Sequence, residues 1–250
     1  MPGSKPGVGY KQIADDLRAR IERGDLQPGD RFPSESEVMA EFKAGRETVS
    51  KALRALQDAG LIVRRKGAAT RVREFAPIRR SANKRLSKST WGAGLSMWSL
   101  DVRDVPLDVT DLRVSRVEAS AKVAEALDIS RGAPVVKRRR SYVLDGKVVL
   151  IAESHIPADL ADGTPIAEED TGPGGIYQRL ADIGHGPERF KEELRARMPT
   201  KAEAVQLELL PGTPVICAIR TAIAADGRVV EINDMRLDAG SFIMDYVIDA

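Results

Sequence analysis

The chain has 250 residues, of which 42% are apolar and 4% aromatic, and its formal net charge is +2. Its single cysteine excludes an intrachain disulfide, and the lack of a long apolar run excludes a transmembrane helix, so we expect a cytoplasmic protein. The length fits two domains, and the low aromatic content predicts that their cores are aliphatic.

The charge is unevenly distributed along the chain. Residues 1–90 hold 20 Lys and Arg against 11 Asp and Glu, whereas residues 91–250 hold 19 against 26. This asymmetry favours a polyanionic partner at the N-terminal end.

The first third of the chain predicts three helices. Residues 12–23 carry apolar side chains at helical spacing, and a turn follows them. Ser34 and Glu37 have the spacing of a capping box, which predicts the start of a second helix. A third helix is predicted from Arg46 to Gly60, because one face carries apolar residues at i, i+4 and i+7, and glycine is common just past a helix end.

The second and third helices form a candidate helix-turn-helix, although an ordinary helical hairpin has the same pattern. The third helix has polar side chains near its N-terminus, where recognition helices carry base-reading residues. These are Arg46, Glu47, Thr48, Ser50 and Lys51. Residues 61–72 then predict a small β-hairpin, or wing, with Arg65, Lys66 and Gly67 at its turn. Residues 64–88 hold ten basic residues and one acid, which indicates either a solvated charged surface or contact with phosphates.

Residues 10–72 resemble the winged-helix domain of the GntR family of bacterial transcription regulators. The resemblance rests on short motifs in register, at residues 10–14, 24–26, 28–30, 32–35, 46–49, 52–53, 56, 60–62 and 67. Phe32, Gly45 and Ala69 depart from the family pattern, which has Leu, Ser and Gly there. The resemblance implies that the polar residues of the third helix and the wing bind DNA. Ser36 stands where the family often has a basic contact.

Residues 76–94 have few apolar side chains and end in Gly92-Ala93-Gly94, so they predict a basic interdomain linker. The expected organisation is a winged helix-turn-helix domain at residues 1–75, this linker, and a second domain at residues 95–250.

The second domain contains an internal repeat with a period of about 80 residues. A capped helix at residues 120–129 corresponds to one at 200–209, and Asp-Gly turns at 145–146 and 226–227 each join two predicted strands. Two such units predict four long strands in one antiparallel sheet with helices on it, which is an α+β fold. Further strands are expected at residues 109–117 and 188–196, and a further helix at 175–183.

Residues 100–245 resemble the UTRA effector domain of the HutC-like branch of the GntR family. The matching pieces are residues 127–129, 132, 138–140, 145–146, 152–153, 156–157, 176–177, 180, 212–215, 230–231 and 236–238. The resemblance implies a chorismate-lyase-like fold, a bound small-molecule effector and a homodimer. Tyr177, Glu231 and Arg236 match family positions and are candidate effector ligands.

A two-residue turn at residues 145–146 places Arg138 opposite Glu153 in the first predicted hairpin. The side chains that then share one face are Arg138, Arg140, Tyr142 and Glu153. Such a set can hold an anionic or polar effector through bidentate hydrogen bonds. A cross-strand Arg–Glu pair on a solvated sheet is the alternative.

The second hairpin, treated in the same way, places Cys217 opposite Arg236 and Arg220 opposite Asn233. Glu231 and Arg236 then lie on opposite faces of the sheet. They therefore cannot both line one site unless a bulge intervenes.

No catalytic or metal-binding pattern stands out. His155 and His185 lie far apart, with no Cys or carboxylate at metal-ligand spacing, so we expect neither a metal nor another cofactor.

The sequence predicts a dimeric, sequence-specific repressor that binds a near-palindromic double-stranded operator and is released by a small-molecule effector. Two alternatives remain. One is a repressor without an effector, for example of plasmid-transfer genes, and the other is a lyase-like enzyme fused to a DNA-binding domain.

Overall fold

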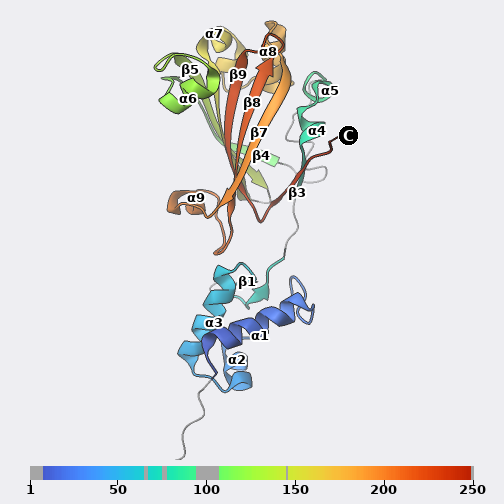
Figure 1. The fold of residues 1–250 in the computed structure, drawn as a ribbon, viewed down its shortest axis with the longest axis vertical. Coiled ribbons are helices and arrows are strands. Elements are labelled where there is room, and N and C mark those ends of the chain that lie inside the picture. The colour runs from blue at the N-terminus through green and yellow to red at the C-terminus, as the bar shows by residue number, and fades with distance from the viewer. Residues whose placement is uncertain (1–7, 65–66, 75–77, 94–106, 145, 249–250) are drawn as a thin grey trace, which may run out of the picture. The chain divides into compact units, whose positions relative to one another are not determined.

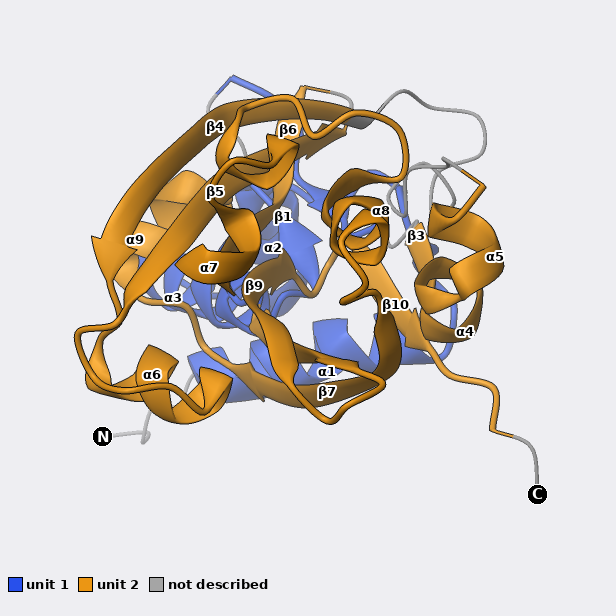
Figure 2. Cartoon of the chain, turned by 90° about the horizontal axis from the view of Figure 1, so that it is seen from above, with its two compact units in different colours: residues 1–76, 210–213 blue, residues 77–209, 214–250 orange. Residues whose placement is uncertain are grey.

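The chain divides into two compact units, shown in Figures 1 and 2. The N-terminal unit comprises residues 1–76 with 210–213, and the C-terminal unit comprises residues 77–209 with 214–250. The computed structural model describes residues 8–64, 67–74, 78–93, 107–144 and 146–248. No helix within these ranges is long and apolar enough to cross a membrane.

The N-terminal unit consists of three helices and a two-stranded antiparallel hairpin, as the sequence predicts. The elements are α1 Tyr10–Glu22, α2 Glu35–Phe42, α3 Arg46–Asp58, β1 Ile62–Val63 and β2 Arg71–Val72. The apolar faces of the helices meet in one core with the hairpin. This core contains Ile13, Leu17, Val38, Val49, Leu53, Leu56, Ile62 and Val72. Burial of these side chains fixes α2 and α3 against each other and leaves their polar sides to the solvent.

Backbone caps define where α2 and α3 begin. The Ser34 hydroxyl accepts a hydrogen bond from the backbone N–H of Glu37 at 3.3 Å, and the Glu37 carboxylate accepts from the N–H of Ser34 at 2.7 Å, which confirms the capping box. The C-cap of α2 is Lys43, whose φ of 49° is left-handed, so the break comes one residue before the expected Ala44-Gly45 step. Gly45 then precedes α3 without a side-chain cap, as its missing hydroxyl predicts.

The C-terminal unit is built on a six-stranded antiparallel sheet in the order β4-β5-β6-β9-β8-β7. Its strands are β4 Leu107–Glu118, β5 Pro134–Leu144, β6 Lys147–Pro157, β7 Pro187–Arg197, β8 Val215–Ala224 and β9 Val229–Asp238. The predicted repeat is confirmed, and its two halves meet where β6 pairs with β9. Each half also begins with a long strand, because β4 precedes α6 (Ala121–Leu127) and β7 precedes α9 (Lys201–Gln206).

Helices cover both faces of this sheet. We call the face that carries Tyr142 and Met235 the inner face, and the one that carries Ile151 and Cys217 the outer face. The inner face is covered by α7 Ala158–Ala161, α8 Gly175–Asp182 and the 3-10 helix Pro165–Ala167. Figure 2 shows α7 and α8 within the curve of the sheet. Helices α6 and α9 pack on the outer face.

The segment predicted as a linker differs from that expectation, because it is structured from Ile78 onward. It forms β3 Ile78–Ser81, α4 Ala82–Leu86 and α5 Lys88–Trp91, and β3 pairs in parallel with the C-terminal strand β10 Phe242–Asp245. Four of its large side chains are at most 9% exposed, namely Ile78, Arg80, Arg85 and Trp91. Sequence patterns conceal this burial because arginine is normally a surface residue.

The second hairpin, β8–β9, has the predicted register over most of its length. Cys217 pairs with Arg236 and Arg220 pairs with Asn233. A bulge at Val230 shifts only the pairs nearest the turn. The predicted placement of these four side chains is therefore confirmed.

The first hairpin, β5–β6, departs from the predicted register. Val149 is an extra residue in a β-bulge, beyond which Arg138 pairs with Ser154 and Arg139 pairs with Glu153. The predicted pairing of Arg138 with Glu153 is wrong, because a slip of one residue moves a side chain to the other face of the sheet. Glu153 therefore lies on the outer face, away from Arg138.

Candidate DNA-binding surface and candidate ligand site

The predicted DNA-contacting side chains of α3 lie at its N-terminal end. The side chains of Arg46 and Glu47 are each 84% exposed, and that of Lys51 is 60% exposed. Thr48 and Ser50 are half-buried beside them. A helix that presents donors and acceptors in its first turns can reach base edges in a major groove.

Ion pairs organise this surface. Glu35, the first residue of α2, accepts a hydrogen bond from Arg46 Nε at 3.0 Å and lies 3.6 Å from Nη2 of Arg64. On α3, Lys51 Nζ donates to Glu47 at 2.8 Å, which lowers the pKa of Glu47 and raises that of Lys51. Sequence reasoning assigned no role to Glu35, and it treated Arg64 only as part of the basic stretch at residues 64–88. Their proximity depends on how α2, α3 and the wing pack, which spacing along the chain does not reveal.

The remaining predicted DNA contacts lie on α2 and in the wing. Ser36 is exposed in the first turn of α2, with its Oγ 3.1 Å from that of Ser34. Gly67 is exposed and has a φ of 79°, a conformation that favours glycine. Arg65 and Lys66 lie outside the described residues.

A row of polar side chains crosses the inner face of the sheet, with one residue from each of five neighbouring strands. Cross-strand pairing joins each member to the next. From β5 to β7 this inner polar row is Arg138, Ser154, Asn233, Arg220 and Glu192. None of the five side chains is more than 5% exposed. Buried polar groups are costly unless they are hydrogen-bonded, so the partners of each member matter.

The Arg138 end of the inner polar row is held by backbone carbonyls. The guanidinium donates to the carbonyl oxygens of Ile166 at 2.7 Å and Glu169 at 2.8 Å, and also to that of Glu168. Burial lowers the pKa of Arg138 to about 10. Arg138 therefore anchors the 3-10 helix and the segment after it onto the sheet.

Two hydrogen bonds join the other predicted effector residues on this side of the sheet. Arg140 Nε donates to Tyr142 Oη at 2.6 Å, and the buried Tyr177 hydroxyl donates to Glu231 at 2.6 Å. Burial raises the pKa of both tyrosines, so both stay protonated at neutral pH. The inner side thus brings together five of the seven predicted residues, Arg138, Arg140, Tyr142, Tyr177 and Glu231.

The middle of the inner polar row holds donors and acceptors that lack hydrogen-bond partners. Arg220 is fully buried, forms a long 3.9 Å ion pair with Glu192, and has its guanidinium carbon 5.6 Å from the centre of the Tyr177 ring. Within the described structure, no hydrogen bond reaches any Arg220 nitrogen, either amide atom of Asn233, or Oγ of Ser154. Sequence reasoning paired Arg220 with Asn233 but assigned neither a function, because pairing alone does not reveal burial.

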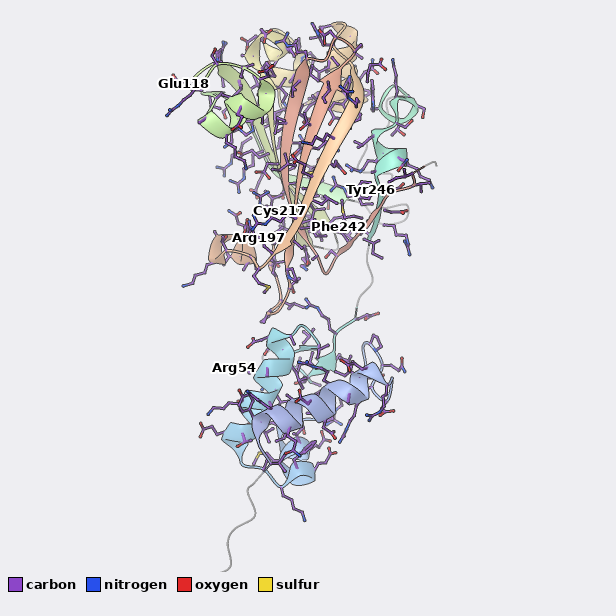
Figure 3. All side chains as sticks on the ribbon, viewed as in Figure 1. Arg54, Glu118, Arg197, Cys217, Phe242 and Tyr246 are labelled. Atoms are coloured by element: carbon purple, nitrogen blue, oxygen red, sulfur yellow. The ribbon has the colours of Figure 1, made fainter. Side chains whose placement is uncertain are left out.

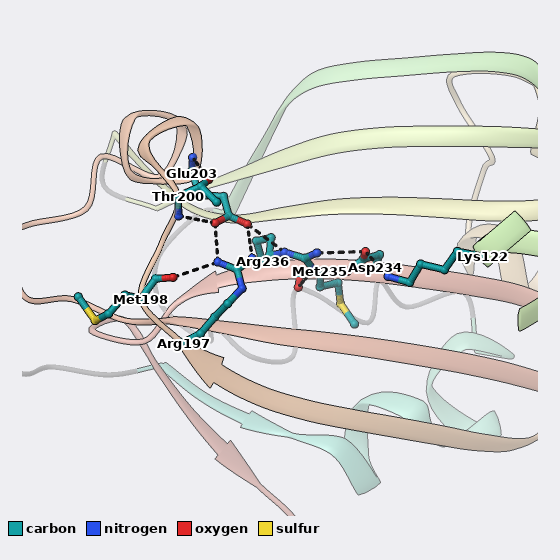
Figure 4. A network of polar contacts seen from close by, with 8 residues as sticks. All are labelled: Lys122, Arg197, Met198, Thr200, Glu203, Asp234, Met235 and Arg236. Carbon is teal, nitrogen blue, oxygen red and sulfur yellow. Dashed lines mark hydrogen bonds and ion pairs between the residues drawn. The ribbon is translucent and has the colours of Figure 1, made fainter. Parts of the chain in front are cut away.

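The other two predicted effector residues lie on the outer face. Glu153 pairs there with Lys137 Nζ at 2.8 Å. Arg236 donates to Glu203 at 3.2 Å and pairs with Asp234, in the network shown in Figure 4. The seven predicted residues therefore do not form one site. Among the described residues, no group of three or more His, Cys, Asp or Glu could hold a metal ion.

Known protein families match the chain in the regions that carry these two sites. The family described as bacterial regulatory proteins, gntR family, matches residues 9–72, which include α1, α2, α3 and the wing. The UTRA domain matches residues 107–242, more than half of the chain, which include the whole six-stranded sheet.

Individual proteins are similar over almost the full length. An uncharacterized HTH-type transcriptional regulator of Streptomyces coelicolor is 32% identical over 230 residues, covering 89% of this chain and 86% of that protein. The HTH-type transcriptional repressor NagR of Bacillus subtilis is 26% identical over 223 residues, covering 89% and 87%. A crystal structure described as a GntR-family transcriptional regulator matches with a TM-score of 0.70 at 27% identity, covering 98% of both chains.

Proposed function

The chain belongs to the gntR family of bacterial regulatory proteins and carries a UTRA domain, and from this we propose that it is a dimeric repressor released from a near-palindromic operator by a small-molecule effector. Family membership makes it a DNA-binding transcription regulator. The similarity to a protein named as a repressor supports the direction of regulation. In this proposal the protein acts in the cytoplasm and catalyses no reaction.

The observation that carries the DNA-binding part is the exposed N-terminal end of α3. In this proposal Arg46 reads a base edge, Glu47 accepts from a cytosine amino group, and the neighbouring hydroxyls position the helix. The supporting contacts come from Thr48, Ser50, Lys51 and Ser36, and from the wing residues Arg65, Lys66 and Gly67. The Glu35–Arg46 hydrogen bond supports the assignment, because it holds a flexible side chain in place before binding.

The test is fluorescence-anisotropy binding to the DNA upstream of the protein's own gene, against a scrambled duplex, at two salt concentrations. Arg46→Ala is expected to weaken specific binding by about 1–3 kcal/mol, roughly 5- to 150-fold, and to leave scrambled-DNA binding nearly unchanged. Arg54→Ala is the matched control, because Arg54 is also exposed on α3 but about 12 Å further along the helix (Figure 3).

Two results would count against this part of the proposal. Unchanged discrimination in Arg46→Ala would remove Arg46 as a base reader. Equal wild-type binding to both duplexes that collapses at the higher salt would leave only phosphate contacts by the basic N-terminal part.

A dimer is proposed because two-fold symmetric regulators bind two half-sites that repeat the symmetry of the protein. Light scattering of the free protein and of its operator complex measures the stoichiometry directly. Two chains per duplex are expected, together with half-sites centred about one helical turn or a multiple of it apart.

For the effector, we propose a site on the inner side of the sheet that includes Arg138, Arg140, Tyr142, Tyr177 and Glu231. Buried polar side chains gather there, and a UTRA domain spans the region. A thermal-shift screen of sugars, sugar phosphates, amino acids and nucleotides tests it. The expected result is a saturable shift with one class, whereas no shift with any class would favour a repressor without an effector.

A further inference from the structure

We propose that Arg220, Asn233 and Ser154 form an oxyanion-binding subsite within the effector site. The inference rests on the proposed effector-binding function and adds the chemical class of the ligand. That ligand carries a phosphate or carboxylate group beside a hydroxyl or amide. The three residues sit on neighbouring strands, β8, β9 and β6, and are joined by direct cross-strand pairs.

The argument starts from the burial of Arg220. Its guanidinium is 0% exposed, and no hydrogen bond reaches it within the described residues. Its ion pair with Glu192 is long, at 3.9 Å, and that carboxylate also contacts two other groups. Arg85 Nη2 lies 3.3 Å from one of its oxygens, and the Tyr246 hydroxyl donates to the other at 2.8 Å. Burial lowers the pKa of Arg220, but nearby groups that include Glu231 and Glu192 raise it above its usual value, so the guanidinium stays charged. Its donors still lack hydrogen bonds within the described residues, and a bound anion would supply them.

The neighbours of Arg220 extend the same pattern. Both amide atoms of Asn233 and the hydroxyl of Ser154 are buried without a hydrogen-bond partner in the described structure. Directly paired residues have Cβ atoms about 5 Å apart, so all these groups border one small region of the inner face. Unsatisfied polar atoms are few in native proteins, and three adjacent residues with the same deficit indicate a missing common partner.

The chemistry of these groups defines that partner. A guanidinium binds phosphate or carboxylate oxygens through two parallel hydrogen bonds. An amide and a hydroxyl each donate and accept, which suits a ligand hydroxyl or amide rather than a second charge. The subsite spans two strand spacings, about 10 Å, which fits a sugar phosphate or a small hydroxy acid.

Arg220, and not Arg138, holds the anion in this inference. Arg138 already donates to three backbone carbonyls, so binding a ligand would require it to release the segment at residues 166–169. It also lies three strands away from Arg220, about 14 Å, which is too far for one anionic group to reach both.

The test measures thermal unfolding of the full chain with inorganic phosphate, with lactate, and with sodium chloride at the same ionic strength. We expect phosphate or lactate to raise the Tm of the wild type saturably by about 4 °C or more, and chloride not to do so. The ligand that gives the larger Tm shift, phosphate or lactate, indicates whether the subsite prefers a phosphate or a carboxylate group. In Arg220→Met we expect no such shift, because the guanidinium that binds the anion is absent. Arg195→Met is the control, since Arg195 is exposed on the outer face.

A second variant introduces a negatively charged side chain of the protein itself next to Arg220. Asn233→Asp places a carboxylate beside Arg220, so it should raise the ligand-free Tm and abolish the oxyanion shift. The inference is overturned if the wild type shows no saturable shift, if phosphate shifts the wild type and Arg220→Met equally as a general salt effect, or if Asn233→Asp keeps the shift.

Operator binding, measured in parallel, separates this inference from the proposed function. Intact operator binding without an oxyanion shift would reject the subsite alone. A saturable shift in a protein that does not discriminate its operator would support the subsite and reject the DNA-binding proposal.

Discussion

Two polar clusters lie on opposite faces of the same sheet, and they differ in how completely their hydrogen bonds are satisfied. On the outer face, the Glu203 carboxylate accepts from two Arg197 nitrogens at 2.7 Å each, from the Thr200 N–H at 2.8 Å and from Arg236 Nε at 3.2 Å (Figure 4). On the inner face, Arg220, Asn233 and Ser154 have buried side-chain atoms without hydrogen-bond partners in the described structure. We call the outer cluster closed, because its central carboxylate is fully hydrogen-bonded, and the inner cluster open, because its buried donors and acceptors lack partners in the described structure.

We infer from this difference that the outer cluster has a structural role, and it agrees with the binding role proposed for the inner one. A carboxylate with four donors has no capacity left for a ligand, so the outer network stabilises the fold by joining α9 to β7 and β9. Removing one of its members should lower stability and leave ligand binding unchanged. In the middle of the inner polar row, in contrast, Arg220, Asn233 and Ser154 have donors without partners in the described structure, a cost in stability that binding sites often carry.

Removing Glu203 should have the largest effect on stability. Glu203→Ala deletes a two-pronged charged hydrogen bond and a capping box in a side chain that is only 15% exposed, so we expect a loss of about 3 kcal/mol in the free energy of unfolding. Urea unfolding followed by circular dichroism measures it. The oxyanion-induced shift of the remaining folded protein should be unchanged.

The control for this variant is Glu193→Ala. Glu193 lies on the outer face too, on β7, but its pair with Lys191 is 3.4 Å long and both side chains are at least 60% exposed, so the expected loss is below about 1 kcal/mol. Equal losses in the two variants would mean that the outer network does not stabilise the fold as a unit.

The same network predicts a pH dependence. Hydrogen bonds from Arg197 hold the pKa of Glu203 at about 2, below its ordinary value of 4.5. A carboxyl whose pKa is lower in the folded state stabilises it at pH values above the unfolded pKa, and this contribution is lost as the pH falls through the folded pKa. The stability difference between wild type and Glu203→Ala should therefore be constant above about pH 5 and shrink between about pH 5 and pH 2. Unfolding curves at several pH values measure it, and a difference that stays constant down to pH 3 would contradict the assignment.

Local patterns were enough to predict most of the elements of both units. The capping boxes at Ser34 and Thr200, the helical spacing in α3 and the turn at Asp226-Gly227 each depend on residues close together in the chain, and so they appear in the sequence. The internal repeat then predicted a single antiparallel sheet, which the strand order confirms.

The predicted ligand site failed in part because its geometry depends on long-range register. No local signal marks Val149 as a bulge, yet that one residue moves Glu153 to the outer face and brings Ser154 to the inner face. Arg220 and Asn233 were paired correctly, but their importance comes from burial by α8 and the neighbouring elements, which sequence spacing does not show. The candidate DNA-binding surface depends less on long-range register, because the single helix α3 carries most of its residues.

The smallest expected effect tests the register itself. If Glu153 faced Arg138, as a regular hairpin would require, Glu153→Gln would remove a carboxylate from the ligand face and change the oxyanion-induced shift. In the structure Glu153 pairs with Lys137 on the outer face, where both side chains are about one-third exposed. Glu153→Gln should therefore lower the free energy of unfolding by only about 0.5 kcal/mol and leave the shift as it is in the wild type. If Glu153→Gln is as stable as the wild type but its Tm no longer responds to phosphate or lactate, Glu153 lies on the ligand side of the sheet. In that case Glu153 belongs to the open cluster on the inner face and not to the outer face.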